Sequence, residues 1–220
     1  MNEYLREYIF EDESIPVVKV CQNPSPQLGH AGTVWDAGLV LCAFLESAEG
    51  VKLIKDSKCI ELGAGTGIVS LVAASRGATE VLVTDLSACV PFIRQNIGMN
   101  VLESSVCKAE VLDWNETSKA DSLAHAFDWV LCADCVYDPS LVDGLIRTVL
   151  ALNPKRGVII SNERREADSN ASAERSFIKS LYEAGFAGKA VHKDVIRPDW
   201  RCEDIDVVVF TRENDSAKGA

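Results

Sequence analysis

A glycine-rich turn is the part of this sequence with the clearest chemical meaning. Gly63, Gly65 and Gly67 follow the mostly apolar run Cys59–Leu62, and a helical pattern begins near Ile68. Glycine carries no Cβ, so such a turn lets the backbone approach a ligand at the N-terminus of a helix. The turn therefore predicts a nucleotide-cofactor site. A tight strand-to-helix turn that binds nothing is the open alternative.

The spacing of these glycines argues against a bound pyrophosphate. Dinucleotide-binding folds carry G-x-G-x-x-G, with the pyrophosphate over the helix end. Here the third glycine arrives one residue early, and the carboxylate of Glu61 precedes the first glycine. An acidic residue beside the turn instead favours a ligand that has hydroxyl groups and a cationic centre.

A second carboxylate follows the next strand-like segment. Val81–Asp85 reads as a buried strand that ends in Asp85, 24 residues after Glu61. In a βαβ unit, an acid about 20 residues beyond the glycine turn meets the hydroxyls of a ribose. Asp85 is therefore a candidate ribose ligand, with an N-cap of the next helix as the alternative.

We expect further ligand-contacting side chains just past the other strand-like segments, because ligands collect at the carboxyl ends of parallel strands. Trp114 ends the third segment and offers a flat ring for stacking on an adenine. Burial in the core is the usual fate of tryptophan and stays open as an alternative. The remaining rim segments are Ala133–Tyr137 after the fourth strand and Asn162–Arg165 after the fifth.

The elements that must position these residues alternate between strand-like and helix-like patterns. The strand-like segments lie near 58–62, 80–84, 105–111, 127–133, 157–161, 188–196 and 205–211. The helical patterns cover 34–47, 67–76, 88–99, 139–152 and 171–184. Such alternation predicts an α/β fold whose mostly parallel sheet is covered by helices on both faces. No helix separates the last two strands, so one of them is expected to enter antiparallel.

The two ends of the chain are expected to lie outside this sheet. Two β-like pieces, 7–10 and 15–20, flank an acidic turn and predict a hairpin. We assign 1–33 to an N-terminal extension with this hairpin, 34–212 to the main domain and 213–220 to a flexible tail. The hairpin and the loop 162–170 are expected to carry substrate specificity, and deletion of 1–20 to spare cofactor binding.

Composition narrows the class of protein. The 220 residues carry a net charge of −11, and 47% of them are hydrophobic, which is typical of a globular domain. No apolar run is long enough to span a membrane, and Met1–Glu7 lacks the features of a signal peptide. We expect a cytoplasmic protein, with the nucleus as a second location. The acidic charge makes nucleic acid an unfavourable partner and basic protein segments a favourable one.

The cysteines and histidines do not predict a metal site. The eight cysteines are expected to be free thiols, because the chain shows no export signal. Cys132 and Cys135 form a C-x-x-C, yet a zinc site needs two more ligands at suitable spacing. The three histidines, His30, His125 and His192, are scattered along the chain and supply none.

Four motifs together resemble those of the seven-β-strand S-adenosylmethionine-dependent methyltransferases. They are E-L-G-A-G-T-G at 61–67, V-T-D-L at 83–86, V-W-D-A at 34–37 and D-C-V-Y at 134–137. The D-x-x-Y after the fourth strand and the upstream V-W-D-A resemble, more narrowly, the methyltransferase-like family 16 of protein-lysine methyltransferases. Within that family the sequences at 161–165 and 201–205 are most similar to the methyltransferase that acts on valosin-containing protein. Asn162 departs from that pattern, which has an aromatic residue there.

The resemblance implies a Rossmann-like class I methyltransferase fold and a set of site residues. Asp134 and Tyr137 would face the incoming amine, and the alternative for Asp134 is a helix cap, for which Asp138 is better placed. Glu163 and Arg164 are candidate substrate contacts. The residues implied to bind S-adenosylmethionine are Trp35, Glu61, Gly63, Gly65, Asp85, Leu86, Trp114 and Ala133.

The implied reaction is methylation of a lysine on another folded intracellular protein. Valosin-containing protein is the first candidate substrate, and heat-shock chaperones and elongation factors are the others within the family. Two other classes of function stay open. One is a methyltransferase of the same fold that acts on a small molecule or a nucleic acid. The other is an interaction module that has lost its cofactor, which the intact acids and glycines disfavour.

Overall fold

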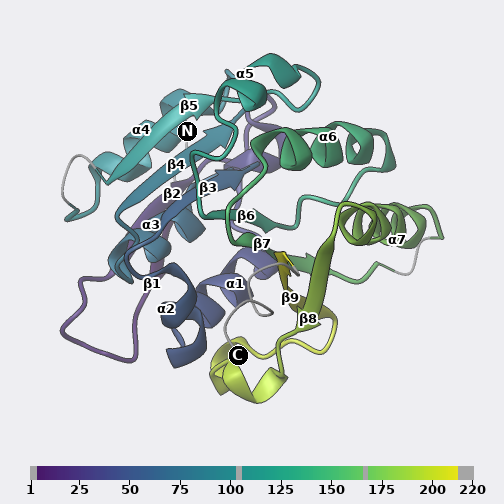
Figure 1. The fold of residues 1–220 in the computed structure, drawn as a ribbon. Helices are drawn as coiled ribbons and strands as arrows, with labels where there is room; N and C mark the ends of the chain where they lie inside the picture. The colour runs from purple at the N-terminus through teal and green to yellow at the C-terminus, as the bar shows by residue number, and fades with distance from the viewer. Residues whose placement is uncertain (1–3, 103–105, 166–167, 213–220) are drawn as a thin grey trace.

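The computed structural model describes residues 4–102, 106–165 and 168–212 of the chain. Their main feature is a seven-stranded sheet with the strand order β5-β4-β3-β6-β7-β9-β8 (Figure 1). Its strands are β3 (Lys58–Leu62), β4 (Glu80–Asp85), β5 (Cys107–Val111), β6 (Trp129–Ala133), β7 (Gly157–Glu163), β8 (Phe186–Ala190) and β9 (Ile205–Arg212).

Five of these strands pair in parallel, and the two pairings made by β9 are antiparallel. Strand β3 pairs in parallel with β4 on one side and with β6 on the other, so the chain order reverses between β3 and β6. Strand β9 runs antiparallel to both of its neighbours, β7 and β8. The predicted α/β fold, its mostly parallel sheet and its antiparallel final strand are confirmed.

Helices cover both faces of the sheet (Figure 1). One face packs against α1 (Asp36–Glu46), α3 (Ile68–Ser75) and α4 (Val90–Gly98), and the short α2 (Ala48–Ile54) follows α1. The other face packs against α5 (Thr117–Ser122), α6 (Val142–Leu152) and α7 (Asp168–Glu183). Apolar residues at intervals of three or four explain this packing; in α6 the buried positions include Val142, Leu145, Val149 and Leu152.

The sequence patterns missed or misplaced a few elements. Helices α2 and α5 are only seven and six residues long, too short to show a clear apolar period. The strand expected at 188–196 ends at Ala190, because the segment beyond it folds into the 3₁₀ turns η3 (Lys193–Val195) and η4 (Pro198–Trp200). The tail expected at 213–220 lies outside the described residues.

The predicted N-terminal hairpin is confirmed, and some of its side chains pack into the core. It forms a two-stranded sheet from β1 (Tyr4–Tyr8) and β2 (Val18–Gln22), and Tyr8 and Val20 are fully buried against the layer of α1, α3 and α4. The Tyr8 hydroxyl donates a hydrogen bond of 2.6 Å to Glu46 Oε2 at the end of α1. Deletion of 1–20 would therefore remove side chains from the core, and the expectation that it spares cofactor binding stays a prediction.

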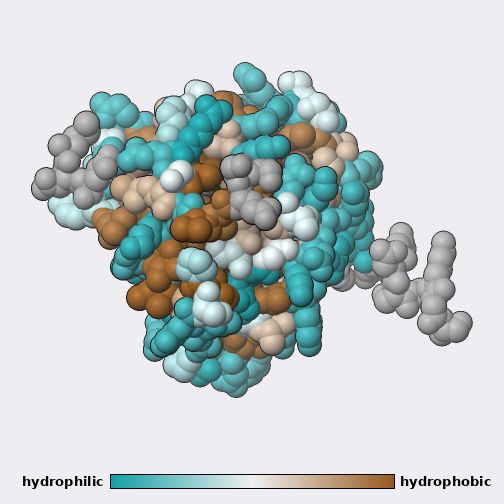
Figure 2. Space-filling model, turned by 90° about the vertical axis from the view of Figure 1, so that its left-hand side faces the viewer, coloured by the Kyte–Doolittle hydropathy of each residue, from teal (hydrophilic) through white to brown (hydrophobic). Residues whose placement is uncertain are grey.

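The outer side of this hairpin is partly apolar. In Figure 2 hydrophobic residues gather in patches among the hydrophilic ones on the face that is turned toward the viewer. On β1 and the residue after it, Tyr4, Leu5 and Ile9 each expose more than half of their surface. Exposed apolar side chains are common on protein surfaces.

Candidate active site

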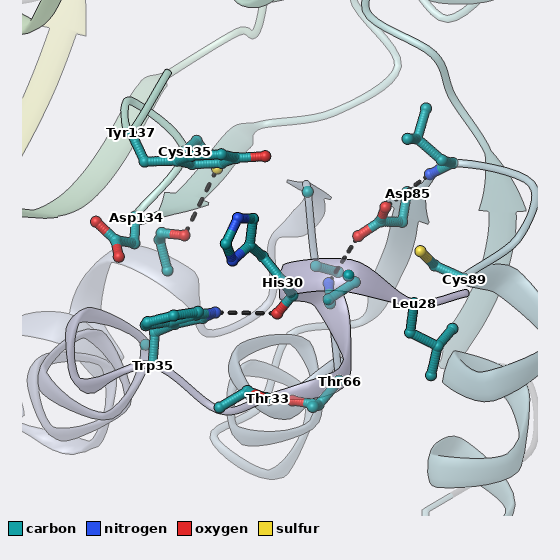
Figure 3. A pocket seen from close by; sticks show the side chains of 18 of the residues that line it. Leu28, His30, Thr33, Trp35, Thr66, Asp85, Cys89, Asp134, Cys135 and Tyr137 are labelled. Carbon is teal, nitrogen blue, oxygen red and sulfur yellow. Dashed lines mark hydrogen bonds between the residues drawn. The ribbon is translucent and has the colours of Figure 1, made fainter. Parts of the chain in front are cut away.

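One cavity of about 710 Å³ opens at the carboxyl ends of β3, β4, β5 and β6, where the strand order reverses. Its outer wall is the loop that precedes α1, with the 3₁₀ turn η1 (Gly29–Gly32) at its centre (Figure 3). Glu163 and Arg164 do not line it. Ten residues singled out in the sequence line it: Trp35, Glu61, Gly63, Gly65, Asp85, Leu86, Trp114, Ala133, Asp134 and Tyr137.

The glycine turn at 63–67 needs glycine for two physical reasons. Gly63 and Gly65 have φ angles of 62° and 56°, in the left-handed region that side chains rarely adopt. A Cβ on Gly63 would also lie 3.0 Å from the ring of Trp114, and one on Gly65 would lie 3.2 Å from the carbonyl oxygen of Ala31. The turn thus lets an aromatic ring and the loop before α1 close on the backbone.

The Asp85 carboxylate is held in place by two backbone donors. Its Oδ2 accepts a hydrogen bond of 2.8 Å from Gly65 N–H, and its Oδ1 accepts one of 2.7 Å from Leu86 N–H. Each carboxylate oxygen has a second lone pair, so a pair of hydroxyl donors in the cavity can still bind it. The arrangement fixes the acid at the end of β4 and ties it to the glycine turn.

Glu61 is buried at the end of β3, with only 2% of its surface exposed. Burial raises its pKa to about 8, although hydrogen bonds from the backbone N–H and the hydroxyl of Ser70 act in the opposite direction. Nearby Asp85 raises the pKa further by charge repulsion. A cation bound beside Glu61 would favour the ionised carboxylate.

Trp114 serves the core and the cavity at once. Its partly buried side chain packs against the cluster of α5, α6 and α7, while its ring lies over Gly63. Gly144 of α6 makes room for it, because a Cβ there would lie 3.0 Å from the Trp114 carbonyl oxygen. Trp114 thus packs partly against the core and also lines the cavity, and its stacking on an adenine stays a prediction.

Asp134 occupies an unusual position after β6. Its φ of 53° is in the left-handed region, which costs a non-glycine residue about 1–3 kcal/mol and is often found at functional sites. Asp134 exposes only 8% of its surface, and its Oδ2 lies 2.7 Å from Arg165 Nη2. Among the described residues, Oδ1 has no hydrogen-bond partner. Asp134 thus lines the cavity and carries a buried carboxylate oxygen whose hydrogen-bonding capacity is unused among the described residues.

Asp138 and Tyr137 have different roles in the loop after β6. Asp138 accepts a hydrogen bond of 2.8 Å from Ser140 N–H and caps η2 (Pro139–Leu141), so Asp134 does not serve as this cap. Burial is the largest of the effects that raise the pKa of Tyr137 above its ordinary value, followed by repulsion from Cys135. Tyr137 therefore keeps its proton at neutral pH and faces the cavity with a hydroxyl donor.

Sequence reasoning missed His30, which lies between two aromatic side chains of the cavity (Figure 3). Its ring centre is 5.7 Å from that of Trp35 and 5.5 Å from that of Tyr137. The indole N–H of Trp35 donates a hydrogen bond of 3.0 Å to the His30 carbonyl oxygen. No spacing in the sequence points to this group, because it joins a loop residue to the far end of β6.

Arg165 was also missed, although the sequence marked the segment that contains it. Arg165 lines the cavity, whereas Arg164 turns away to Asp206 of β9, with 3.4 Å between Nη1 and Oδ2. Glu163 is exposed, and the buried side chain of Asn162 does not line the cavity. Side chains alternate between the two faces of an extended segment, which explains why Arg165 lines the cavity and Arg164 does not. This alternation is the signal in the sequence that could have identified Arg165.

The two cysteines of the C-x-x-C segment are buried. Cys132 and Cys135 are buried free thiols, and Cys135 Sγ donates to the Leu62 carbonyl oxygen at 3.1 Å. A hydrogen bond with Cys132, and then burial, raises the pKa of Cys135 well above its ordinary value. Within the residues that the structure describes, no three His, Cys, Asp or Glu side chains form a metal-binding group. Across the same residues, no helix is long and apolar enough to cross a membrane.

Solved structures of methyltransferases share this fold. The Pyrococcus horikoshii protein PH1948 superposes with a TM-score of 0.57 at 19% identity, covering 88% of this chain and 90% of its own. The magnesium protoporphyrin IX methyltransferase of Synechocystis, solved with bound S-adenosylhomocysteine, gives a TM-score of 0.54 at 14% identity and covers 80% of this chain and 84% of its own. At these identities the likeness establishes the fold.

Sequence comparison identifies the family. A family model described as lysine methyltransferase matches residues 18–184. The protein N-lysine methyltransferase METTL21A of Xenopus tropicalis is 41% identical over 63% of this chain and 62% of its own length. The EEF1A lysine methyltransferase 3 of the same species is 30% identical over 89% and 81%. The yeast protein-lysine N-methyltransferase EFM6 is 31% identical over 73% and 75%. The chain therefore belongs to the S-adenosylmethionine-dependent lysine methyltransferase family.

Proposed function

We propose that this protein methylates a lysine side chain of a folded intracellular protein. The observation that supports this most directly is the shared cavity: Asp134 and Tyr137 line the same space as the glycine turn and Asp85. A donor group that enters beside Asp134 thus reaches the space next to the cofactor turn. Membership of the lysine methyltransferase family identifies the expected donor as a lysine amine.

We propose that the cofactor binds at the end of the cavity that is formed by the glycine turn at 63–67 and the side chains around it. Asp85 binds the ribose hydroxyls, and Glu61 faces the cationic methionine part. Trp114 and Leu86 flank the adenine, and Trp35 closes the site from the start of α1. Gly63, Gly65 and Ala133 provide close backbone approach. When bound, S-adenosylmethionine supplies an activated methyl group for direct displacement by a nucleophile.

The amine end of the cavity, which is the part lined by Asp134 and Tyr137, has to align a neutral lysine. A lysine with an ordinary pKa of about 10.4 is protonated at pH 7, and removing that proton costs about 4 to 5 kcal/mol. Desolvation in the cavity lowers this cost, because burial disfavours the charged form of an amine. Asp134 and Tyr137 orient the amine, and the proton leaves to water. The protein contributes alignment, which is worth several kcal/mol in a displacement reaction.

The substrate is proposed to be a protein with a basic or lysine-bearing surface. The net charge of −11 favours such a partner. The candidates are valosin-containing protein, a heat-shock chaperone and an elongation factor, and a relative named for EEF1A supports the last. The narrower likeness to the enzyme for valosin-containing protein stays a prediction. Glu163 and Arg164 are proposed to touch the substrate outside the cavity, because both are exposed at the end of β7.

The test is transfer of a heavy methyl group. Purified protein and S-adenosylmethionine with a heavy methyl are added to a cell lysate and to the three purified candidates, and peptides are analysed by mass spectrometry. We expect heavy methyl on lysine, absent with Asp134→Ala. Label confined to RNA or small metabolites would contradict the proposal and support the alternative methyltransferase of the same fold.

A further inference from the structure

A carboxylate next to the lysine amine creates a chemical conflict. The amine must lose its proton to attack the methyl group, yet a negative charge within about 4–6 Å stabilises the protonated form. Asp134 with an unbalanced charge would therefore hold the substrate as an unreactive ammonium ion. If Asp134 orients the amine, some group has to balance its charge first.

Arg165 is placed to balance that charge. Its Nη2 lies 2.7 Å from Asp134 Oδ2, and both side chains are shielded from water, with 25% and 7% of their surface exposed. Arginine is always charged in proteins, so the guanidinium stays a cation at every pH of interest. The same Nη2 is 3.5 Å from Glu163 Oε2, but that carboxylate is 48% exposed and is screened by water.

Resting on the proposed function, we propose that Arg165 is a positioning residue that neutralises Asp134 and thereby lets it orient a neutral amine. The ion pair uses Oδ2 and leaves Oδ1, which is buried and has no partner among the described residues, free to accept an amine N–H. An amine that donates a hydrogen bond to this neutral ion pair is oriented by it. Its protonated form is not stabilised, because the ion pair carries no net negative charge.

The other titratable groups do not replace Arg165 in this role. Tyr137 keeps its proton, because its pKa is raised, chiefly by burial. On α7, Glu174 is bonded to Asn162 rather than to the pair. Arg164, the neighbouring cation, is engaged with Asp206. The remaining titratable groups that line the cavity are His30 in the loop before α1, Glu61 held by Ser70, Asp85 held by Gly65, Cys89, Asp113 and Cys135.

The test uses a lysine-side-chain probe, so it needs no protein substrate. The protein is saturated with S-adenosylhomocysteine, and binding of n-butylammonium at pH 7.5 is measured by ligand-observed NMR. Arg165→Gln leaves Asp134 unbalanced, so we expect it to bind the ammonium about tenfold more tightly than the wild type, the factor for one pKa unit. Arg165→Lys and the control Arg147→Gln, a change at an exposed arginine of α6 that does not line the cavity, should stay near the wild-type affinity.

Two further measurements make the result decisive. Adding Asp134→Asn to Arg165→Gln should abolish the increase in ammonium affinity. With a protein substrate, Arg165→Gln should lose about tenfold in kcat/KM at pH 7.5, and this loss should disappear as the pH is raised toward 10. Unchanged or weaker ammonium binding by Arg165→Gln would overturn the proposal, as would an equal activity loss at every pH. Arg165→Met is the second variant if Arg165→Gln does not bind S-adenosylhomocysteine. A wild type that methylates no protein would instead contradict the proposed function, whatever the probe shows.

Discussion

The buried carboxyl group of Glu61 leads us to predict that cofactor binding releases a proton near neutral pH. Burial raises its pKa from an ordinary value of 4.5 to about 8, so the ligand-free protein holds this carboxyl mostly protonated at pH 7. If the cationic methionine part of the cofactor lies beside it, binding favours the ionised form. Binding below pH 8 must then release the Glu61 proton.

The size and sign of the effect follow from the raised pKa. Between pH 6 and 7 most Glu61 is protonated, so the affinity for S-adenosylmethionine should rise by up to about tenfold per pH unit and level off above pH 8. In the absence of ligand the same shift lowers stability. The folded protein binds this proton more tightly than the unfolded chain, so stability falls as the pH rises from about 4.5 to 8.

Calorimetry at pH 6.0, 6.5, 7.0 and 7.5 in two buffers of different ionisation enthalpy measures both the affinity and the protons released. The matched variant is Glu61→Gln, which keeps an acceptor for Ser70 N–H but does not titrate. We expect its affinity to change little over this range. We also expect its ligand-free melting temperature to exceed that of the wild type at pH 9, where the buried charge of Glu61 destabilises the wild type.

Equal pH slopes for the wild type and Glu61→Gln, or an absence of proton release, would refute the reasoning. The cofactor cation would then lie away from Glu61, and the buried carboxyl would serve only to hold Ser70 at the start of α3. A Glu61→Gln variant that melts lower than the wild type at pH 9 would refute the stability argument separately.

The remaining predictions concern the other walls of the cavity. Asp85→Ala should weaken binding of S-adenosylhomocysteine by more than about 1 kcal/mol, the scale of charge-assisted hydrogen bonds, and unchanged calorimetric affinity in a folded variant would contradict the ribose assignment. Asp134→Ala and Tyr137→Phe should reduce turnover far more than cofactor affinity, and equal losses in both would move them to the nucleoside side. His30→Ala should lower kcat/KM for the protein substrate by about fivefold or more, because it removes two ring contacts, with Trp35 and Tyr137, that are worth about 0.5–1.5 kcal/mol each. His30→Phe should keep kcat/KM, and a loss in both variants would point to the imidazole nitrogens instead.

The residues at strand ends could be predicted because their placement is a local consequence of the sheet. Asp85 and Asp134 each follow a buried apolar run, and parallel strands bring their carboxyl ends to one edge. Gly63 and Gly65 mark a turn that needs left-handed backbone. Periodicity and turn chemistry are therefore sufficient to indicate which segments surround the cavity.

The hairpin shows where local patterns stop being informative. Two short β-like pieces with an acidic turn read as an appendage, since nothing in them indicates a partner. In the structure Tyr8 reaches Glu46, which is 38 residues away, and Arg197 Nη1 lies 3.4 Å from the same carboxylate. Such contacts depend on how distant segments pack, so only the folded chain reveals that the hairpin belongs to the core.

What the sequence by itself determined is the α/β fold, the glycine turn and the acids at the ends of β3, β4 and β6, because each depends on residues close together in the chain. The tertiary structure alone decided which side chains complete the amine end. His30 reaches Tyr137 because the loop before α1 packs on Gly65. Arg165 rather than Arg164 meets Asp134 because β9 offers Asp206 to the other arginine. These pairings join residues more than 30 positions apart, and no local preference encodes them.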